Sequence, residues 1–296
     1  MLLRTSWHRS EVLGTALAGL MALGISGANA SPVEVIEVYP GPNALAQALA
    51  AADPGDILNI HAGVYHEAVT VSDDALTLRA AGDGPVTVDG DCQTRYVIAV
   101  RADGVEIVGL RVTGAAEGFG PFPAEIDFSN LTGGRVHDSV LRDTCDAEYG
   151  VNVFSVGGAM TVSASTASGF SDAGIYIGGI TSPGATVVVR GNHAFANYWG
   201  IIVEDSAGGS ISVLGNNVHD NSPAGIYVPR SDGVSIWNNS VMNNDQAGIH
   251  LTAESDDNLI ARNTVEGHFF DLRDDGGSSN CWRNNVYTTS SGDISC

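Results

Sequence analysis

The sequence predicts an all-β protein, a single-stranded right-handed parallel β-helix of about ten coils with an N-terminal capping helix. Two markers recur with nearly the same period, and the segments between them hold no amphipathic stretch long enough for a helical repeat. Periods of about 20 to 50 residues indicate solenoids or related arrays. The short phrases alternate at a period of two and end at Gly, Asn, Asp or Ser, so each repeat corresponds to one coil of strands and turns.

The first marker is a Gly-apolar-x-apolar phrase at the start of a strand. It recurs at steps of 23 to 26 residues, and a degenerate last copy follows after 21. We expect the apolar residues on either side of the middle position to stack inside the coils, and the Gly to permit a positive φ or a close approach at a corner. The copies lie at 150–153, 174–177, 200–203, 225–228, 248–251 and 269–272.

The second marker is an asparagine that follows a short β-rich phrase. It recurs at steps of 21 to 24 residues, at Asn192, Asn216, Asn239, Asn263 and Asn284. Asparagine tolerates the left-handed region and bonds to its own backbone in turns, and stacked Asn side chains bond along a column. We interpret these residues as structural.

The N-terminal part follows the same plan less regularly. Residues 43–52 form the only good helix pattern, and we expect this helix to cover the open end of the solenoid. No linker interrupts the chain, so 31–296 is predicted to be a single β-helix domain. Strand phrases follow at 57–60, 68–71, 76–79, 86–88, 97–100 and 105–108.

Residues 1–30 are predicted to be a secretory signal peptide. A weakly basic start precedes an apolar run over 12–25, and Ala28-Asn29-Ala30 has the small-x-small pattern of a cleavage site. The alternative is a single anchoring helix, but the run is shorter than the ~20 residues that span a bilayer. We therefore expect a secreted or periplasmic protein with no membrane contact after cleavage.

The net charge limits the classes of partner that the protein could bind, and the cysteine content indicates its redox compartment. The net charge is −21 and the chain has no lysine, which argues against nucleic acid and other polyanions unless a local Arg patch exists. All four cysteines lie in the exported part, so two disulfides are expected. Of the three pairings we favour Cys92–Cys145 and Cys281–Cys296, because each joins segments that we expect to be close.

The segment 43–90 resembles the entry segment of the pectate-lyase-like parallel β-helix superfamily. There a capping helix leads into a Pro-Gly-Asp-apolar strand and a G-x-Y-x-E turn, here Gly63-Val64-Tyr65-His66-Glu67, and the later repeats look like the generic parallel β-helix repeat. The resemblance covers 34–290. It implies the fold and not the reaction, because the superfamily spans lyases, hydrolases, epimerases, copper-accessory proteins and adhesins.

The repeat predicts which side chains share the outer face of one sheet. The middle positions form a column of Asn152, Tyr176, Ile202, Tyr227, His250 and Asp271, and two residues further on lie Phe154, Gly178, Glu204, Pro229, Thr252 and Arg273. We expect Asp271 beside His250 to raise the pKa of the imidazole. The predicted catalytic residues are Tyr227, His250, Asp271, Arg230 and Arg273, and the predicted substrate-binding residues are Glu204, Tyr176 and Trp199.

This group suits proton abstraction at C5 of a uronic acid, in which Arg neutralises the carboxylate while Tyr or His moves protons. The leading hypothesis is a lyase-like or C5-epimerase-like protein, expected to be a monomer, that acts on a uronate-containing polysaccharide. One alternative is a non-catalytic carbohydrate-binding or cell-surface structural solenoid. Another is a glycoside hydrolase with paired carboxylates such as Glu204 and Asp271. The phrase 149–154 keeps the Tyr-Gly of alginate epimerases but lacks their Asp and His.

No metal site is predicted with certainty. Calcium is the one cofactor considered, at Asp256-Asp257 or Asp274-Asp275, although turn aspartates are the commoner explanation. A copper site would require a cluster of His or Met. The histidines of the exported part are scattered through the sequence, at 61, 66, 137, 193, 219, 250 and 268.

Overall fold

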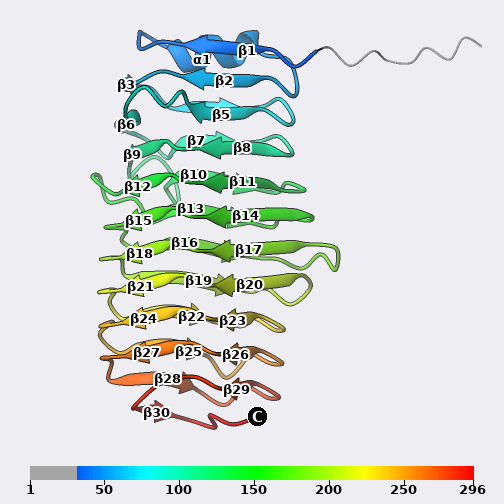
Figure 1. Ribbon diagram of the computed structural model, residues 1–296, viewed down its shortest axis with the longest axis vertical. Coiled ribbons are helices and arrows are strands. Elements are labelled where there is room, and N and C mark those ends of the chain that lie inside the picture. The colour runs from blue at the N-terminus through cyan, green and yellow to red at the C-terminus, as the bar shows by residue number, and fades with distance from the viewer. Residues whose placement is uncertain (1–31) are drawn as a thin grey trace, which may run out of the picture. The chain divides into compact units, whose positions relative to one another are not determined.

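Three parallel sheets run through the protein, and successive coils stack along one axis (Figure 1). The computed structural model describes residues 32–296, and Val33–Cys296 form one compact unit. The predicted right-handed parallel β-helix is confirmed, and the predicted strands at 57–60 and 105–108 have the predicted bounds. The predicted signal peptide lies outside the described residues. Among the described residues, no helix has the length and apolar character needed to cross a membrane.

Each coil contributes in turn to sheets A, B and C. From the N-terminal end, sheet A contains β1 (Val35–Val38), β2 (Ile57–Ile60), β5 (Thr77–Ala80), β8 (Val105–Val108), β11 (Gly134–His137), β14 (Ala159–Ser163), β17 (Thr186–Arg190), β20 (Ser210–Leu214), β23 (Ser235–Trp237), β26 (Leu259–Ala261) and β29 (Cys281–Arg283). Sheet B contains β3 (Gly63–His66), β6 (Val86–Thr94), β9 (Arg111–Ala115), β12 (Val140–Arg142), β15 (Thr166–Ser168), β18 (His193–Phe195), β21 (Asn217–His219), β24 (Ser240–Met242) and β27 (Thr264–Glu266). Sheet C contains β4 (Val69–Val71), β7 (Tyr96–Val100), β10 (Ala124–Ser129), β13 (Tyr149–Phe154), β16 (Ala173–Gly178), β19 (Trp199–Glu204), β22 (Ala224–Val228), β25 (Ala247–Leu251), β28 (Phe270–Asp274) and β30 (Ser290–Ser291).

The Gly-apolar-x-apolar phrases form the strands of sheet C from β13 onward. The first apolar residues of the five complete phrases stack with Leu272 of β28 as one buried column of Val151, Ile175, Ile201, Ile226, Ile249 and Leu272. The glycine is needed for close approach and not for a positive φ. At Gly200, an added Cβ would lie 2.4 Å from Val218 Cγ1 and 2.6 Å from the carbonyl oxygen of Gly225.

Buried asparagines form two ladders along the stack. In the first, each side-chain amide donates to the Oδ1 of the next, from Asn192 through Asn216, Asn239 and Asn263 to Asn285. The expectation of Asn284 at the last rung is therefore wrong: Asn284 has a φ of 55° and precedes the ladder residue. Each rung follows such a left-handed residue, so the ladder Asn is not the left-handed position itself. The second ladder was not predicted and runs through Asn197, Asn221, Asn244 and His268.

The predicted capping helix is α1 (Ala44–Ala51), which lies at the N-terminal end of the stack (Figure 1). It buries Leu45, Ala48 and Leu49 in the core. The Glu67 carboxylate accepts hydrogen bonds from the backbone N–H groups of Leu45 and Ala46, at 2.9 and 3.0 Å. The G-x-Y-x-E turn is therefore structural, since its last residue caps the helix.

Both predicted disulfides are present. Cys92–Cys145 joins the segment at β6 to the turn before β13, and Cys281–Cys296 ties the C-terminus to β29. Both are therefore cross-links between coils or between a coil and the C-terminus, which stabilise the folded chain.

Candidate functional site

The outer face of sheet C carries the predicted column, with one correction in the last coil. Asn152, Tyr176, Ile202, Tyr227 and His250 are register partners on successive strands. The partner of His250 is Arg273 and not Asp271, because Leu272 pairs with Ile249. The degenerate phrase 269–272 had no glycine to fix its alignment, and the strand is displaced by two residues from the predicted register.

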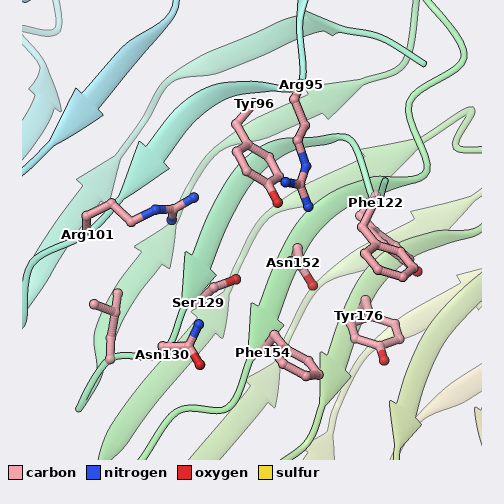
Figure 2. Close-up of a pocket in the computed structure, with 11 residues that line it drawn as sticks. Arg95, Tyr96, Arg101, Phe122, Ser129, Asn130, Asn152, Phe154 and Tyr176 are labelled. Atoms are coloured by element: carbon pink, nitrogen blue, oxygen red, sulfur yellow. The ribbon is translucent and has the colours of Figure 1, made fainter. Parts of the chain in front are cut away.

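The first part of the site is a pocket of about 540 Å³, which we call the arginine–tyrosine pocket. It lies over β7, β10, β13 and β16. Figure 2 shows the guanidinium groups of Arg95 and Arg101 on either side of the Tyr96 ring, with their Cζ atoms 4.5 and 5.3 Å from its centroid. Its remaining wall is formed largely by Phe122, Tyr149, Asn152, Phe154 and Tyr176.

A buried carboxylate lies below this pocket. Asp127 is fully buried, and Arg101 Nη1 lies 2.5 Å from its Oδ2. Its Oδ1 accepts hydrogen bonds from Asn152 Nδ2 at 2.6 Å and Ser129 Oγ at 2.8 Å. These contacts fix the Arg101 side chain, whereas Arg95 has no carboxylate partner among the described residues and its Nε makes no hydrogen bond there. Arg95 is thus a cation available to an anionic ligand.

Two phenols extend the pocket toward the C-terminal coils. Tyr149 donates to Asp172 Oδ2 and Tyr176 donates to Glu204 Oε2, both at 2.9 Å, and the two rings lie 4.7 Å apart. Burial raises the pKa of both phenols, so both stay protonated at neutral pH. They are suited to hold a ligand by hydrogen bonds and ring contact, not to act as bases.

The second part of the site, over β19, β22, β25 and β28, is the Tyr227 cluster, which consists of Trp199, Tyr227, His250, Arg273 and Asp275. Trp199 stacks on Tyr227 with centroids 4.2 Å apart, and Tyr227 lies 5.0 Å from the His250 ring. His250 Nε2 lies 2.8 Å from Asp275 Oδ2, and Arg273 Nε lies 2.7 Å from Asp275 Oδ1. The structure therefore brings together Trp199, Tyr227, His250 and Arg273, with Asp275 in the place that was predicted for Asp271.

The two predicted arginines already have acidic partners. Arg230 Nη2 lies 2.5 Å from Glu204 Oε1, and Arg230 Nε lies 2.6 Å from Asp205 Oδ1. Arg273 is paired with Asp275. Carboxylate recognition by these arginines would require an exchange of partners, so Arg95 is the cation of this face without an acidic partner in the described part of the chain. Sequence reasoning missed Arg95, Tyr96 and Arg101 because the coils of β7 and β10 lack the Gly phrase.

Asp271 is a structural residue at the C-terminal end. It is buried, its Oδ1 lies 3.0 Å from His268 Nδ1, and its Oδ2 accepts from the backbone N–H groups of Thr288 and Thr289. Glu204 and Asp271 are on strands separated by β22 and β25, about 14 Å at the usual strand spacing. Paired carboxylates in glycosidases are about 5 to 9.5 Å apart, so these two do not form such a pair.

The prediction for the His250 pKa is also wrong in sign. Burial lowers the pKa of His250, and the contact with Asp275 only partly opposes this. The imidazole is therefore neutral at pH 7 and able to accept a proton.

Acidification should lower the free energy of unfolding, because the folded protein holds His250 in its neutral form. Because its pKa is lower in the folded than in the unfolded protein, its contribution is complete above the unfolded value of about 6.5 and is lost as the pH falls toward the folded pKa. We expect His250→Gln to destabilise the protein at pH 7.5 and to do so less at pH 5.5. Urea unfolding of both proteins at the two pH values measures this difference. A difference that stays constant or grows on acidification would contradict the assignment.

The aspartates considered for calcium accept hydrogen bonds within turns. Asp256 Oδ1 accepts from Ser278, and the buried Asp274 accepts from Trp282 Nε1 and two glycine N–H groups. Two other groups bring possible metal ligands together. One is His66 with Asp89 and Asp91. The other is His193 and His219 on sheet B, whose Nε2 atoms lie 2.6 Å apart.

Among the solved structures that resemble this chain are a pectate lyase and alginate or mannuronan epimerases. The pectate lyase Pel9A aligns with a TM-score of 0.60 at 15% identity, covering 90% of this chain and 80% of that one. The periplasmic alginate epimerase AlgG aligns at 0.53 and 12%, covering 81% and 75%. The A-module of the Azotobacter vinelandii mannuronan C-5 epimerase AlgE4 aligns at 0.51 and 14%, covering 86% of each chain. No curated protein sequence matches the chain.

These likenesses establish the fold class, the pectate-lyase-like parallel β-helix. Within that class the sequence matches the family described as periplasmic copper-binding protein (NosD) over residues 84–293, and the chain belongs to this family. Family membership and the two disulfides indicate a protein that is secreted or periplasmic.

Proposed function

We propose that the outer face of sheet C binds an acidic, uronate-containing polysaccharide, with the arginine–tyrosine pocket as the subsite for a sugar carboxylate. The observation that carries this proposal is the pair of guanidinium groups at Tyr96, in a chain whose net charge is −21. A local cationic pocket on an acidic protein attracts an anionic group at one point, which would fix where an acidic polymer lies on this face. The partly exposed rings of Tyr176 and Trp199 could stack on sugar rings.

The more specific proposal is lyase-like or C5-epimerase-like chemistry at the Tyr227 cluster. Neutral His250 is the candidate base for the C5 proton, and the Tyr227 hydroxyl is the candidate acid. Burial raises the pKa of Tyr227, which keeps its proton available. Arg273 and Arg230 would act on the substrate only after release from Asp275 and from Glu204 and Asp205.

Binding is tested with polygalacturonate, alginate and a neutral glucan in affinity electrophoresis. We expect retention by an acidic polymer and not by the glucan, and about tenfold weaker retention for Arg95→Gln, because one charge-assisted hydrogen bond contributes about 1.5 to 3 kcal/mol. Arg142→Gln is the matched control, since Arg142 is exposed on β12 of sheet B. Equal retention of Arg95→Gln and the parent protein would exclude the arginine–tyrosine pocket.

Catalysis is tested on whichever polymer binds. New ultraviolet absorbance from unsaturated ends indicates a lyase, and an altered epimer ratio in the NMR spectrum indicates an epimerase. His250→Gln and Tyr227→Phe should abolish either signal while leaving Arg95-dependent binding in place. Binding without either signal would support the non-catalytic carbohydrate-binding alternative.

Copper binding is a second candidate function, because the family is described as copper-binding and the fold supplies ligands of the right chemistry. Imidazole nitrogens are common copper ligands, and His193 and His219 present theirs to the same point. Bound copper would supply a redox-active or exchangeable metal centre.

A further inference from the structure

Two histidines 26 residues apart in sequence meet on the outer face of sheet B. His193 begins β18 and His219 ends β21, so they are diagonal neighbours on adjacent strands. Their Nε2 atoms lie 2.6 Å apart, at the short limit of hydrogen-bond distances. Both side chains are partly exposed, so the pair is open to an ion from solution.

A carboxylate fixes the tautomer of one ring. His219 Nδ1 lies 2.7 Å from Asp220 Oδ2, so the ring proton is held at Nδ1 and the Nε2 lone pair points to His193. A carboxylate on the second ring nitrogen is the usual arrangement behind a metal-binding imidazole.

An aromatic ring keeps the two imidazoles in place. Phe195 stacks on His219 with an interplanar angle of 9° and contacts the His193 ring at 4.6 Å between centroids. This ring contacts both imidazoles and forms part of an apolar surface beside the pair. Such an apolar surface around ligands is a regular feature of metal sites.

A thioether is available on the next coil. Met242 is the register partner of His219, and the alternation of buried and partly exposed residues places both on the outer face of sheet B. At the usual strand spacing of about 4.8 Å, Met242 lies one strand from His219 and two strands from His193. Met242 is one of only two methionines among the described residues, and the other, Met160, is buried in the core.

We infer that His193, His219 and Met242 bind one copper ion as Cu(I). This inference rests on the second candidate function, copper binding, and assigns the residues that hold the metal. Thioether sulfur is a soft donor that favours Cu(I), while Zn²⁺ and harder ions favour thiolate, imidazole and carboxylate sets. The rival group, His66 with Asp89 and Asp91, is mostly exposed and rich in oxygen, so it suits a harder ion. Sheet B also lies apart from the polysaccharide-binding face, so copper would not compete with a sugar ligand there.

The test is a Cu(I) competition titration of the whole exported protein against bicinchoninate. Ascorbate is the reductant, because thiols would open the two disulfides. We expect one Cu(I) per chain and at least a hundredfold weaker binding for His193→Gln and for His219→Gln. Asp220 is exposed and is not itself a proposed ligand. Asp220→Asn should weaken binding by about 10 to 100-fold, because the amide no longer orients His219 as the carboxylate does. His66→Gln, the control for the rival group, should bind normally.

Sulfur ligation is read separately from affinity. The copper X-ray absorption spectrum should contain a sulfur scatterer that Met242→Leu removes. Urea midpoints of all variants show whether they are folded. A protein that binds no Cu(I) overturns both the copper function and the site. Stoichiometric Cu(I) that survives His193→Gln and His219→Gln, or that is lost in His66→Gln, overturns the site alone.

Discussion

Replacement of Asn239 by alanine should lower the free energy of unfolding by about 4 kcal/mol. Its buried amide donates to Val213 O and to Asn263 Oδ1, and its Oδ1 accepts from the backbone and side-chain N–H groups of Asn216. The substitution leaves several of these groups without a partner in a site closed to water. Each such group costs about 1 to 3 kcal/mol, and part of this is regained when neighbours relax.

Urea denaturation with the disulfides intact measures the effect. Asn217→Ala is the matched control, because Asn217 is exposed on β21 and its side chain makes no hydrogen bond to the described residues. We expect a change below about 0.5 kcal/mol for this control. A loss below about 1 kcal/mol for Asn239→Ala would mean that the ladder contributes little beyond ordinary turn contacts.

Replacement of Arg101 by methionine should cost about 3 kcal/mol. The Asp127 carboxylate is fully buried and Arg101 is its only cationic partner among the described residues. Removing one member of a buried pair costs about 3 to 5 kcal/mol, and the lower limit applies here because the Arg101 side chain is 37% exposed. Asn152 and Ser129 would still donate to Asp127 but could not offset its charge.

The double variant Arg101→Met with Asp127→Asn separates charge from packing. The neutral amide needs no cation, so we expect the double variant to recover at least half of the lost stability in urea denaturation. If the double variant is as unstable as Arg101→Met alone, the loss of stability comes from the packing of the Arg101 side chain and not from the unpaired charge of Asp127. Acidic-polymer retention should fall in both variants, because both lack the guanidinium group.

The sequence predicts the fold well because each repeat of the sequence corresponds to one coil of the structure. Inward apolar residues, corner glycines and ladder asparagines recur since each coil meets the same neighbours. The prediction fails where the repeat loses its markers. At the last coil, Phe270 and Asp271 replace the Gly phrase, and the register is displaced by two residues. At Asn284 and Asn285, two identical neighbours left the ladder residue ambiguous in sequence and only the backbone distinguishes them.

The candidate site is only partly predictable for a related reason. Tyr227 and His250 were placed together because both stand in copies of the phrase. Arg95 and Arg101 flank a strand without it, so no sequence alignment of the coils brings them to Tyr149 and Tyr176. His193 and His219 stand at different positions of their strands, and a column read straight along the stack does not pair diagonal neighbours. The direction of the His250 pKa shift was also predicted wrongly, because the burial that lowers this pKa depends on the tertiary structure.

The coil-to-coil register also bears on how such a protein changes over evolutionary time. Each strand pairs only with its equivalents in the coils before and after it. Insertion of one extra coil between β16 and β19 would join matching edges on both sides and lengthen the face of sheet C, and it would separate Tyr176 from Glu204 while leaving Trp199, Tyr227 and His250 together. The distance between the arginine–tyrosine pocket and the Tyr227 cluster would therefore change in steps of one coil, and under the proposed function this would change the spacing between the sugar units that the two parts contact.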